Sequence, residues 1–237
     1  GVGSGITYDS QPADEYAESL GKAAFLHAGE EEFHLFETLR RDKDCCRSVE
    51  RHLARLAASA RFFGFPFDRD EAAQLLEQLE VGGAAPLRIK LSLLPSGRLT
   101  ITSAGIAPEQ SPLVIGISSF RVDPANCLLY HKTSYRGRYD SERRRRPDCG
   151  EVIFCNCRGE LAEGSYNNIV LKIGGKLLTP PLASGLLPGV LRGELLDNGA
   201  IIERILYPEN LFAAEEIRLV NSLRGSRRAV LAEGEKI

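Results

Sequence analysis

The sequence predicts an α+β fold of two domains, and three patterns indicate it. Apolar residues recur at helical spacing after Ser48 and again from about Asp70 to Leu79. Apolar and polar residues alternate over residues 87–93, which is typical of a half-buried strand. A polar stretch bracketed by prolines, residues 108–112, follows these elements and predicts a linker. We therefore expect a small domain before this linker and a larger domain after it.

The small domain, residues 29–107, is predicted to contain a strand, two helices and a hairpin. The first strand is expected over residues 33–40. Ser48 is a suitable N-cap for the first helix, and a Phe-Pro segment after residue 61 ends that helix. Pro95-Ser96-Gly97 then turns strand 87–93 back into strand 98–102, which predicts an antiparallel hairpin.

The larger domain, residues 113–237, is predicted to be rich in strands. Runs of apolar residues indicate strands at residues 113–117, 151–156, 168–173 and 176–179. Gly174-Gly175 predicts a hairpin between the last two strands, and Arg158-Gly159-Glu160 is expected to turn strand 151–156 toward strand 168–173. Lys132 is expected at the head of a helix.

The composition favours a small-molecule partner. The chain has 237 residues, 43% of them hydrophobic, and 30 basic side chains balance 32 acidic ones. This balance gives no electrostatic reason to expect nucleic acid or an anionic membrane as a partner. No apolar run approaches the roughly 20 residues that cross a bilayer, and no secretory signal is evident at the start. We expect a cytoplasmic protein.

The run Arg143–Arg146 is flanked by acids and is expected to be a solvated loop or helix end.

The cysteines predict free thiols and no metal site. They lie at positions 45, 46, 127, 149, 155 and 157, a spacing that suits neither a disulfide framework nor zinc. Cys155 and Cys157 stand two positions apart on a predicted strand, so both are expected on one face of it.

Lys132 is the first candidate for chemistry. It lies in the run Tyr130-His131-Lys132-Thr133-Ser134-Tyr135-Arg136, directly after an apolar stretch that can bury it. A desolvated lysine with a lowered pKa can form a Schiff base with an aldehyde. The alternative is a solvated surface charge, which is the ordinary state of a lysine.

Two later segments give Lys132 a context. These are Glu163-Gly164-Ser165-Tyr166-Asn167-Asn168 and the run from Ser184 to Arg192, Ser-Gly-Leu-Leu-Pro-Gly-Val-Leu-Arg. In this order the three segments resemble the fold-type IV pyridoxal-phosphate enzymes. This is the class IV aminotransferase family, which includes branched-chain and D-amino-acid aminotransferases and 4-amino-4-deoxychorismate lyase. The segments are most similar to the lyase branch.

The resemblance spans roughly residues 30–237 and implies a fold, a cofactor and roles. The implied fold has a small α/β domain and a larger domain with a mainly antiparallel sheet. The implied cofactor is pyridoxal 5'-phosphate, with Lys132 as its Schiff-base lysine and as the base that moves a proton on the substrate. Glu163 is expected to face the ring nitrogen of the cofactor. Arg136 is expected to help keep Lys132 neutral, if this stretch is helical.

The cofactor phosphate is expected at the start of a helix. Pro188 suits the first helical position, and the resemblance implies that Gly189, Val190 and Leu191 hold the phosphate through close backbone approach and exposed amides. Arg55, in the pattern His52-Leu-Ala-Arg-Leu, corresponds to an arginine that reaches the phosphate in the family. The alternative for Arg55 is a solvated helix face.

The resemblance also places pocket residues. Thr38 is expected as a second catalytic residue, and Asn221-Ser222-Leu223 lies where relatives line the substrate pocket, although residues of these types are often only structural. Tyr139 is spaced differently from the tyrosine that contacts the cofactor in branched-chain aminotransferases, so that role is not carried over.

Residues 1–28 resemble a different family. The run Gly-Val-Gly-Ser-Gly-Ile-Thr-Tyr-Asp-Ser is similar to the closing segment of para-aminobenzoate synthase component I, which uses chorismate. This implies natural fusion to a synthase domain. The alternative is a glycine-rich leader followed by a capped helix at about residues 14–26.

These resemblances together imply a 4-amino-4-deoxychorismate lyase, and relatives lead us to expect a homodimer. The first alternative is a class IV amino-acid aminotransferase with the same Lys132 and Glu163. The second is a non-catalytic interaction module whose fusion partner performs the chemistry.

Overall fold

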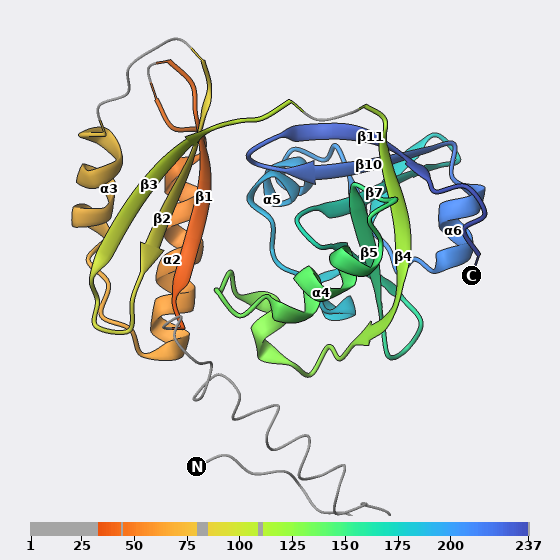
Figure 1. The fold of residues 1–237 in the computed structure, drawn as a ribbon, viewed down its shortest axis with the longest axis horizontal. Coiled ribbons are helices and arrows are strands. Elements are labelled where there is room, and N and C mark those ends of the chain that lie inside the picture. Colours follow the sequence, from red (N-terminus) through yellow and green to blue (C-terminus); the bar gives the residue numbers. More distant parts are fainter. Residues whose placement is uncertain (1–32, 44, 80–84, 109–110, 237) are drawn as a thin grey trace, which may run out of the picture.

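The computed structural model describes residues 33–43, 45–79, 85–108 and 111–236. These residues form a small three-stranded sheet with two helices and a larger eight-stranded sheet with three helices. Figure 1 shows the two units side by side, with the C-terminus next to α6 (Pro208–Ala213) in the large unit. The predicted synthase-like tail, residues 1–28, and its helix lie outside the described residues, as do two residues of the predicted linker.

The small unit is an antiparallel sheet with α2 and α3 packed against it. Its strands are β1 (Leu35–Arg41), β2 (Leu87–Leu93) and β3 (Leu99–Gly105), and its helices are α2 (Val49–Phe63) and α3 (Arg69–Glu77). Leu35 and Leu39 pack with Leu53, Leu56 and Ala60 of α2. Because side chains alternate along a strand, Phe36 and Thr38 lie on the opposite face of β1. Both residues line a cavity together with residues of the large unit, and Figure 1 shows β1 as the strand of the small sheet nearest to that unit.

Ser48 does not cap α2 through its side chain. Its backbone is left-handed, with φ of 53°, and its Oγ donates to Glu194 Oε1 of the large unit at 2.6 Å instead. The helix ends where the sequence predicts, because Gly64 adopts φ of 73° and its N–H donates to the Ala60 carbonyl. The cap of α3 is Asp68, whose carboxylate accepts from the amides of Asp70 and Glu71.

The large sheet is mixed, with the order β6-β5-β4-β11-β10-β7-β8-β9. Four neighbouring pairs are antiparallel, whereas β4 runs parallel to β5 and to β11, and β8 runs parallel to β9. The strands are β4 (Leu113–Val122), β5 (Glu151–Asn156), β6 (Leu161–Gly164), β7 (Asn168–Ile173), β8 (Lys176–Thr179), β9 (Ile202–Glu203), β10 (Glu216–Asn221) and β11 (Gly225–Leu231). The helices are α4 (Gly137–Arg145), α5 (Val190–Asp197) and α6. Leu, Ile and Ala side chains from seven of these strands form its main core.

Three local expectations are wrong. The turn at Arg158–Glu160 leads to β6, which pairs with β5, and not directly to β7. β6 has four residues, all buried, so no alternation of apolar and polar residues marks it. Lys132 does not begin a helix: a 3₁₀ turn, η1 (Cys127–Tyr130), ends before it and α4 begins at Gly137. Cys155 is buried in β5, whereas Cys157 lies in the exposed turn beyond the strand, so the two do not share a strand face.

The segment around Lys132 adds to the edge of the small sheet. The Phe36 N–H donates to the Lys132 carbonyl at 3.0 Å, and Ser134 N–H donates to the His34 carbonyl at 2.8 Å. Leu35 forms an antiparallel bridge with Thr133. These contacts fix Lys132 between the two units, and its side chain therefore meets the outward face of β1.

Within the described ranges, no helix is long and apolar enough to cross a membrane. Over the same ranges, no group of three or more His, Cys, Asp or Glu side chains is arranged to hold a metal ion.

Candidate functional site

A cavity of about 610 Å³ lies between the small sheet and the large unit. Its walls bring together most of the residues singled out in the sequence: Thr38, Arg55, Lys132, Glu163, Gly189, Val190, Asn221, Ser222 and Leu223. Leu191 is not in the wall, and its side chain packs against the cluster of Val170, Ile201 and Val220. Residues that are up to 185 positions apart in the sequence thus share one pocket.

Lys132 extends its amine over the Phe36 ring, with Nζ 4.9 Å from the ring centroid. Burial, followed by the charges of Arg55 and Arg136, lowers the pKa of Lys132 to about 7 against the opposing charges of Glu37 and Glu163. The amine is therefore partly neutral at neutral pH, which is the form that attacks a carbonyl or accepts a proton. Arg136 contributes to this state through its charge, although the stretch between the two residues is not helical.

Glu163 is the third residue of β6, and its carboxyl group is buried in the same pocket. Burial raises the pKa of Glu163 to about 7, against hydrogen bonds from the Leu187 amide at 3.1 Å and the Tyr139 hydroxyl at 3.1 Å. The charge of Lys132 also acts on the pKa of Glu163. An amine and a carboxyl group, each with its pKa displaced toward 7, therefore face the same cavity.

Tyr139 and Asn168 support Glu163, and the sequence did not assign a role to either. Tyr139 lies on α4 and packs on Phe154 at a centroid distance of 4.6 Å, which directs its hydroxyl at the Glu163 carboxylate. Burial, followed by the charge of Glu163, raises the pKa of Tyr139, so this hydroxyl remains a donor. Asn168 donates to the Leu187 carbonyl at 3.0 Å and approaches Glu163 at 3.4 Å.

The start of α5 forms another wall of the pocket. The helix begins at Val190, with Gly189 as N-cap, so Pro188 precedes the helix and does not occupy its first position as predicted. A β-carbon added to Gly189 would lie 1.9 Å from Asn168 Oδ1, so only glycine fits there. The first amides of an α-helix have no partner within the helix and favour an anion.

Arg55 is held beside this helix start by a buried acid that sequence reasoning missed. Glu37 accepts from Arg55 Nε at 2.8 Å and Nη2 at 2.6 Å, and it contacts His52 Nδ1 at 2.7 Å. Burial alone would raise the pKa of Glu37, but the Arg55 and His52 interactions outweigh burial and lower it to about 2. Arg55 Nη1 also donates to the Pro188 carbonyl at 2.9 Å. The sequence did contain a signal: Glu37 lies two positions from both Leu35 and Leu39, so it shares the apolar face of β1 with them.

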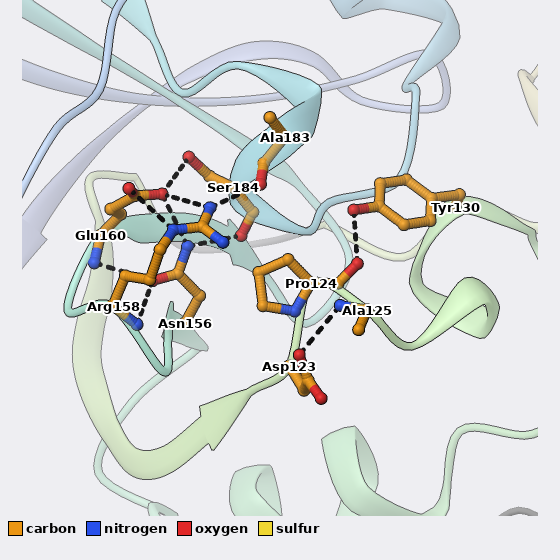
Figure 2. A network of polar contacts seen from close by, with 9 residues as sticks. All are labelled: Asp123, Pro124, Ala125, Tyr130, Asn156, Arg158, Glu160, Ala183 and Ser184. Carbon is orange, nitrogen blue, oxygen red and sulfur yellow. Dashed lines mark hydrogen bonds and ion pairs between the residues drawn. The ribbon is translucent and has the colours of Figure 1, made fainter. Parts of the chain in front are cut away.

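Two loops that lead to the pocket are fixed by the polar contacts in Figure 2. Glu160 accepts from Asn156 at 2.8 Å, from Ser184 at 2.9 Å and from Arg158 at 3.0 Å, which anchors the turn η2 (Leu182–Ser184) before Leu187. The Tyr130 hydroxyl donates to the Pro124 carbonyl at 2.8 Å and fixes the chain before Lys132.

The two loops meet at Gly185. It has φ of +86°, and a β-carbon there would lie 3.1 Å from Leu129 and 3.2 Å from Pro124. Glycine is therefore needed both for the backbone conformation and for the close approach of the two loops.

The family model of class IV amino-transferases matches residues 34–231 of this chain. The chain belongs to the class IV aminotransferase family. This membership and the two-sheet architecture confirm the α+β fold-type IV class that the sequence predicts.

Three proteins of known sequence or structure are similar to this chain, the last of them in fold. A structure from Mesorhizobium loti, provisionally titled an amino-acid aminotransferase, is 36% identical, covers 85% of this chain and 100% of its own, and has a TM-score of 0.79. A Schizosaccharomyces pombe protein, provisionally named aminodeoxychorismate lyase, is 28% identical over 85% of this chain and 90% of its own length. A Mycobacterium tuberculosis structure, titled a hypothetical aminotransferase in PLP-bound form, is 21% identical over 89% of this chain and 84% of its own, with a TM-score of 0.75.

Membership of this family confirms pyridoxal phosphate as the expected cofactor. The residues that line the pocket are chemically suited to hold it. Lys132 has an amine with a lowered pKa. Glu163 has a buried carboxyl group that is close enough for the charge of Lys132 to affect its pKa. The N-cap of α5, Gly189, has no side chain, so a ligand in the cavity can approach the backbone at the start of this helix. The Arg55 guanidinium lies beside it. Lys132 therefore suits the aldehyde of the cofactor, Glu163 suits its ring nitrogen, and the start of α5 with Arg55 suits its phosphate.

Proposed function

We propose that this chain is a pyridoxal-phosphate-dependent 4-amino-4-deoxychorismate lyase, which releases pyruvate and 4-aminobenzoate. The observation that carries a catalytic role is the shared pocket of Lys132 and Glu163, with both pKa values displaced to about 7. The lyase activity is supported by the Schizosaccharomyces pombe relative and by the lyase-like segments at residues 131–133, 163–168 and 186–192.

The proposed cofactor contacts follow from the walls of the pocket. Lys132 is the lysine that holds the cofactor, and Glu163 faces its ring nitrogen. Val190 and Leu191 offer backbone amides to the phosphate, Gly189 allows its close approach, and Arg55 offers a charge-assisted hydrogen bond from the side. When bound, the cofactor supplies an aldehyde for amines and a ring that accepts electrons.

The residues of the chain then have defined tasks. Lys132, in its neutral form, removes the proton from the ring carbon that bears the substrate's amine. The bond from the ring to the enolpyruvyl oxygen breaks, the six-membered ring becomes aromatic, and the leaving group takes up a proton to become pyruvate. Glu163 would keep the ring nitrogen of the bound cofactor protonated, and the hydrogen bonds from the Tyr139 hydroxyl and the Leu187 amide orient its carboxyl group. Thr38 lines the same cavity, and we propose that its hydroxyl contacts the substrate.

The test uses the purified chain loaded with cofactor. With 4-amino-4-deoxychorismate alone, the expected result is continuous release of pyruvate and 4-aminobenzoate in equal amounts, and Lys132→Ala is expected to abolish it. Absence of pyruvate from the loaded wild-type protein over many turnovers would refute the lyase proposal.

An aminotransferase is the second candidate, because the Mesorhizobium loti relative carries that title at 36% identity. It would use the same Lys132 and Glu163 with an amino acid and an oxo acid. The same assay separates the two candidates, since a transaminase stops after half a turnover without an oxo acid, whereas a lyase needs no second substrate.

We also infer two features of the assembly from the resemblances. The synthase-like residues 1–28 support natural fusion to a chorismate-using domain, and the relatives support a homodimer. Sequencing the transcript upstream of this region tests the fusion. Sedimentation equilibrium of the loaded protein tests the dimer, with a mass near 26.0 kDa contradicting it.

A further inference from the structure

One face of α2 holds the small unit against the large one. Side chains three or four positions apart lie on the same face of a helix, and residues with this spacing along α2 and its N-cap contact the large unit. Ser48 Oγ donates to Glu194 Oε1 of α5 at 2.6 Å. Arg51 Nη2 donates to Asp197 Oδ2 at the end of the same helix, also at 2.6 Å. The residues that form this docking stripe are Ser48, Arg51, Arg55, Ser59 and Phe62.

The middle of the docking stripe reaches the start of α5. Arg55 Nη1 donates to the Pro188 carbonyl at 2.9 Å. Ser59 and Phe62 follow within two turns and contact His131. An α-helix rises about 1.5 Å per residue, so Ser59 lies about 6 Å beyond Arg55 along the axis. α2 therefore connects the helix start that we assign to the phosphate with the segment that carries the reactive lysine.

His131 is fixed by three contacts with α2. Its Nδ1 lies 2.9 Å from Ser59 Oγ. Its ring centroid lies 4.4 Å from that of Phe62 and 5.0 Å from that of Phe63. Burial lowers the pKa of His131, so its imidazole is neutral at neutral pH, and a neutral imidazole pairs with a hydroxyl group in either tautomer. The four residues of this His131 clamp are His131, Ser59, Phe62 and Phe63.

Two features of α2 find a reason in the His131 clamp. Ser59 is only 3% exposed, although serine is less favourable than alanine inside a helix and a buried hydroxyl group needs a hydrogen-bond partner. Phe62 is 56% exposed, although phenylalanine is usually buried. His131 provides the partner for the hydroxyl group and stacks on the exposed ring. Both residues are therefore explained by their contacts with His131.

The clamp and β1 together hold Lys132 from both sides. On the C-terminal side, Thr133 forms a bridge with Leu35. The carbonyl of Lys132 itself accepts from the Phe36 N–H at 3.0 Å. On the N-terminal side, the clamp fixes His131. A lysine amine ends a flexible four-carbon stem, so its position depends on how firmly the backbone beneath it is fixed.

We propose that His131 is a positioning residue for Lys132: its docking on Ser59 of α2 sets the distance between the Lys132 amine and the start of α5. A ligand that holds its phosphate at the helix start then presents its aldehyde to the amine. The amine adds to the aldehyde carbon and water leaves, so that a C=N bond replaces the C=O bond. His131 acts on this step through the backbone of its neighbour. This inference rests on the proposed function in that it takes Lys132 as the lysine that holds the cofactor.

Without the clamp, the segment that carries Lys132 is held by β1 alone and samples other positions. The apparent affinity for a ligand falls in proportion to the fraction of molecules in the competent position. This loss concerns only ligands that bond to Lys132. Ligands that are held by the phosphate and ring groups alone keep their affinity, because the hydrogen bonds that orient Arg55 and Glu163 do not involve His131.

The test compares two ligands on the cofactor-free chain by calorimetry. Pyridoxal phosphate carries the aldehyde. Pyridoxamine phosphate has the same ring and phosphate but an amine in place of the aldehyde, so it cannot condense with Lys132. The ratio of the two dissociation constants isolates the contribution of the lysine.

Three clamp variants and one control are measured. His131→Ala removes the clamp, and His131→Asn retains a polar group beside Ser59. Phe62→Ala removes only the stacked ring. Phe212→Ala is its matched control, because Phe212 of α6 is likewise an exposed aromatic residue, at 44%, and lies outside the cavity wall.

We expect His131→Ala to weaken the binding of pyridoxal phosphate roughly tenfold, because the clamp combines a hydrogen bond with aromatic contacts. Binding of pyridoxamine phosphate is expected to change less than about twofold. His131→Asn and Phe62→Ala should each give a smaller change of the same kind, and Phe212→Ala should change neither affinity. Thermal unfolding checks that each variant folds, and if His131→Ala does not fold, the other two clamp variants decide.

Two results would overturn the inference. One is equal weakening of both ligands in the clamp variants, which is the result of a purely structural role. The other is an affinity for pyridoxal phosphate that is the same in the wild type and in all clamp variants that fold.

The outcomes separate this inference from the proposed function. If the wild type releases pyruvate and borohydride reduction labels Lys132, while the ratio is unchanged in the clamp variants, the inference fails and the lyase activity stands. If the wild type releases no pyruvate but the ratio depends on His131, the lyase proposal fails and the positioning role stands.

Discussion

Arg55 connects Glu37 to the helix start at Pro188. Its Nε and Nη2 donate to the Glu37 carboxylate at 2.8 and 2.6 Å, and its Nη1 donates to the Pro188 carbonyl at 2.9 Å. A buried acid on β1 thereby sets the orientation of a guanidinium in the cavity wall. The alternative of a solvated helix face does not describe Arg55, whose side chain is only 11% exposed.

Glu37→Gln is expected to destabilise the protein at neutral pH. The folded-state pKa of Glu37, about 2, lies below its ordinary value of 4.5. The ionised carboxylate therefore contributes stability that is present above about pH 4.5 and is lost as the pH falls toward 2. The contribution is about 3 kcal/mol.

Denaturant unfolding of both proteins across pH 2–7 measures this contribution. The stability difference between wild type and Glu37→Gln should be largest at pH 7 and should shrink toward pH 2. Glu50→Gln is the control, because Glu50 pairs with Arg69 while its side chain is 82% exposed, and such pairs contribute little. A difference that stays constant with pH would contradict the assignment.

Gly189→Ala is expected to weaken cofactor binding and to destabilise the fold by about 1–3 kcal/mol. The new β-carbon would meet Asn168 Oδ1 at 1.9 Å, and displacing Asn168 also disturbs Leu187 and Glu163. Gly193→Ala on the same helix is the matched control, since its β-carbon meets only Arg51 Nη1 at 3.6 Å. The control should be neutral or stabilising by about 0.5–1 kcal/mol. Titration with pyridoxal phosphate and thermal unfolding compare the two, and similar effects would argue against a crowded helix start.

Glu163→Gln is expected to lower turnover of the loaded enzyme by at least about tenfold, because a neutral amide cannot keep the ring nitrogen protonated. In the cofactor-free protein, the same change is expected to raise stability relative to the wild type at high pH. The folded pKa of about 7 lies above the ordinary 4.5, so the folded state holds a proton that the unfolded state has lost between these values. Wild-type stability therefore falls as pH rises from 4.5 to 7.

The glutamine variant does not titrate and should not show that loss. Unfolding of the cofactor-free proteins at pH 4.5 and pH 8 checks this, with the variant gaining on the wild type at pH 8. Unchanged turnover together with an unchanged pH dependence would remove Glu163 from the site.

Much of the architecture could be predicted from local patterns. The alternation at residues 87–93 and the buried run at residues 151–156 coincide with β2 and β5, because each strand has clear turn residues at its ends. β6 could not be predicted, since its four buried residues show no period. The parallel pairing of β4 with β5 and β11 joins distant segments and leaves no local signal.

The site shows the same division. Lys132, Glu163 and the helix start belong to segments whose order resembles a family, so the sequence predicts them together. Glu37 and Tyr139 depend on tertiary contacts: Tyr139 meets Glu163 only because α4 packs on β5, and Glu37 meets Arg55 only because α2 packs on β1. Lys132 was expected on a helix, yet its position is set by pairing with β1.

The most direct test of the account identifies the lysine that holds the cofactor. The protein is incubated with pyridoxal phosphate, its visible spectrum is recorded, the adduct is reduced with borohydride, and the modified peptide is sequenced by mass spectrometry. We predict a visible band that is absent from Lys132→Ala, with the reduced cofactor on Lys132. Modification of Lys90, the other lysine over the Phe36 ring, or a band that persists in Lys132→Ala, would contradict it.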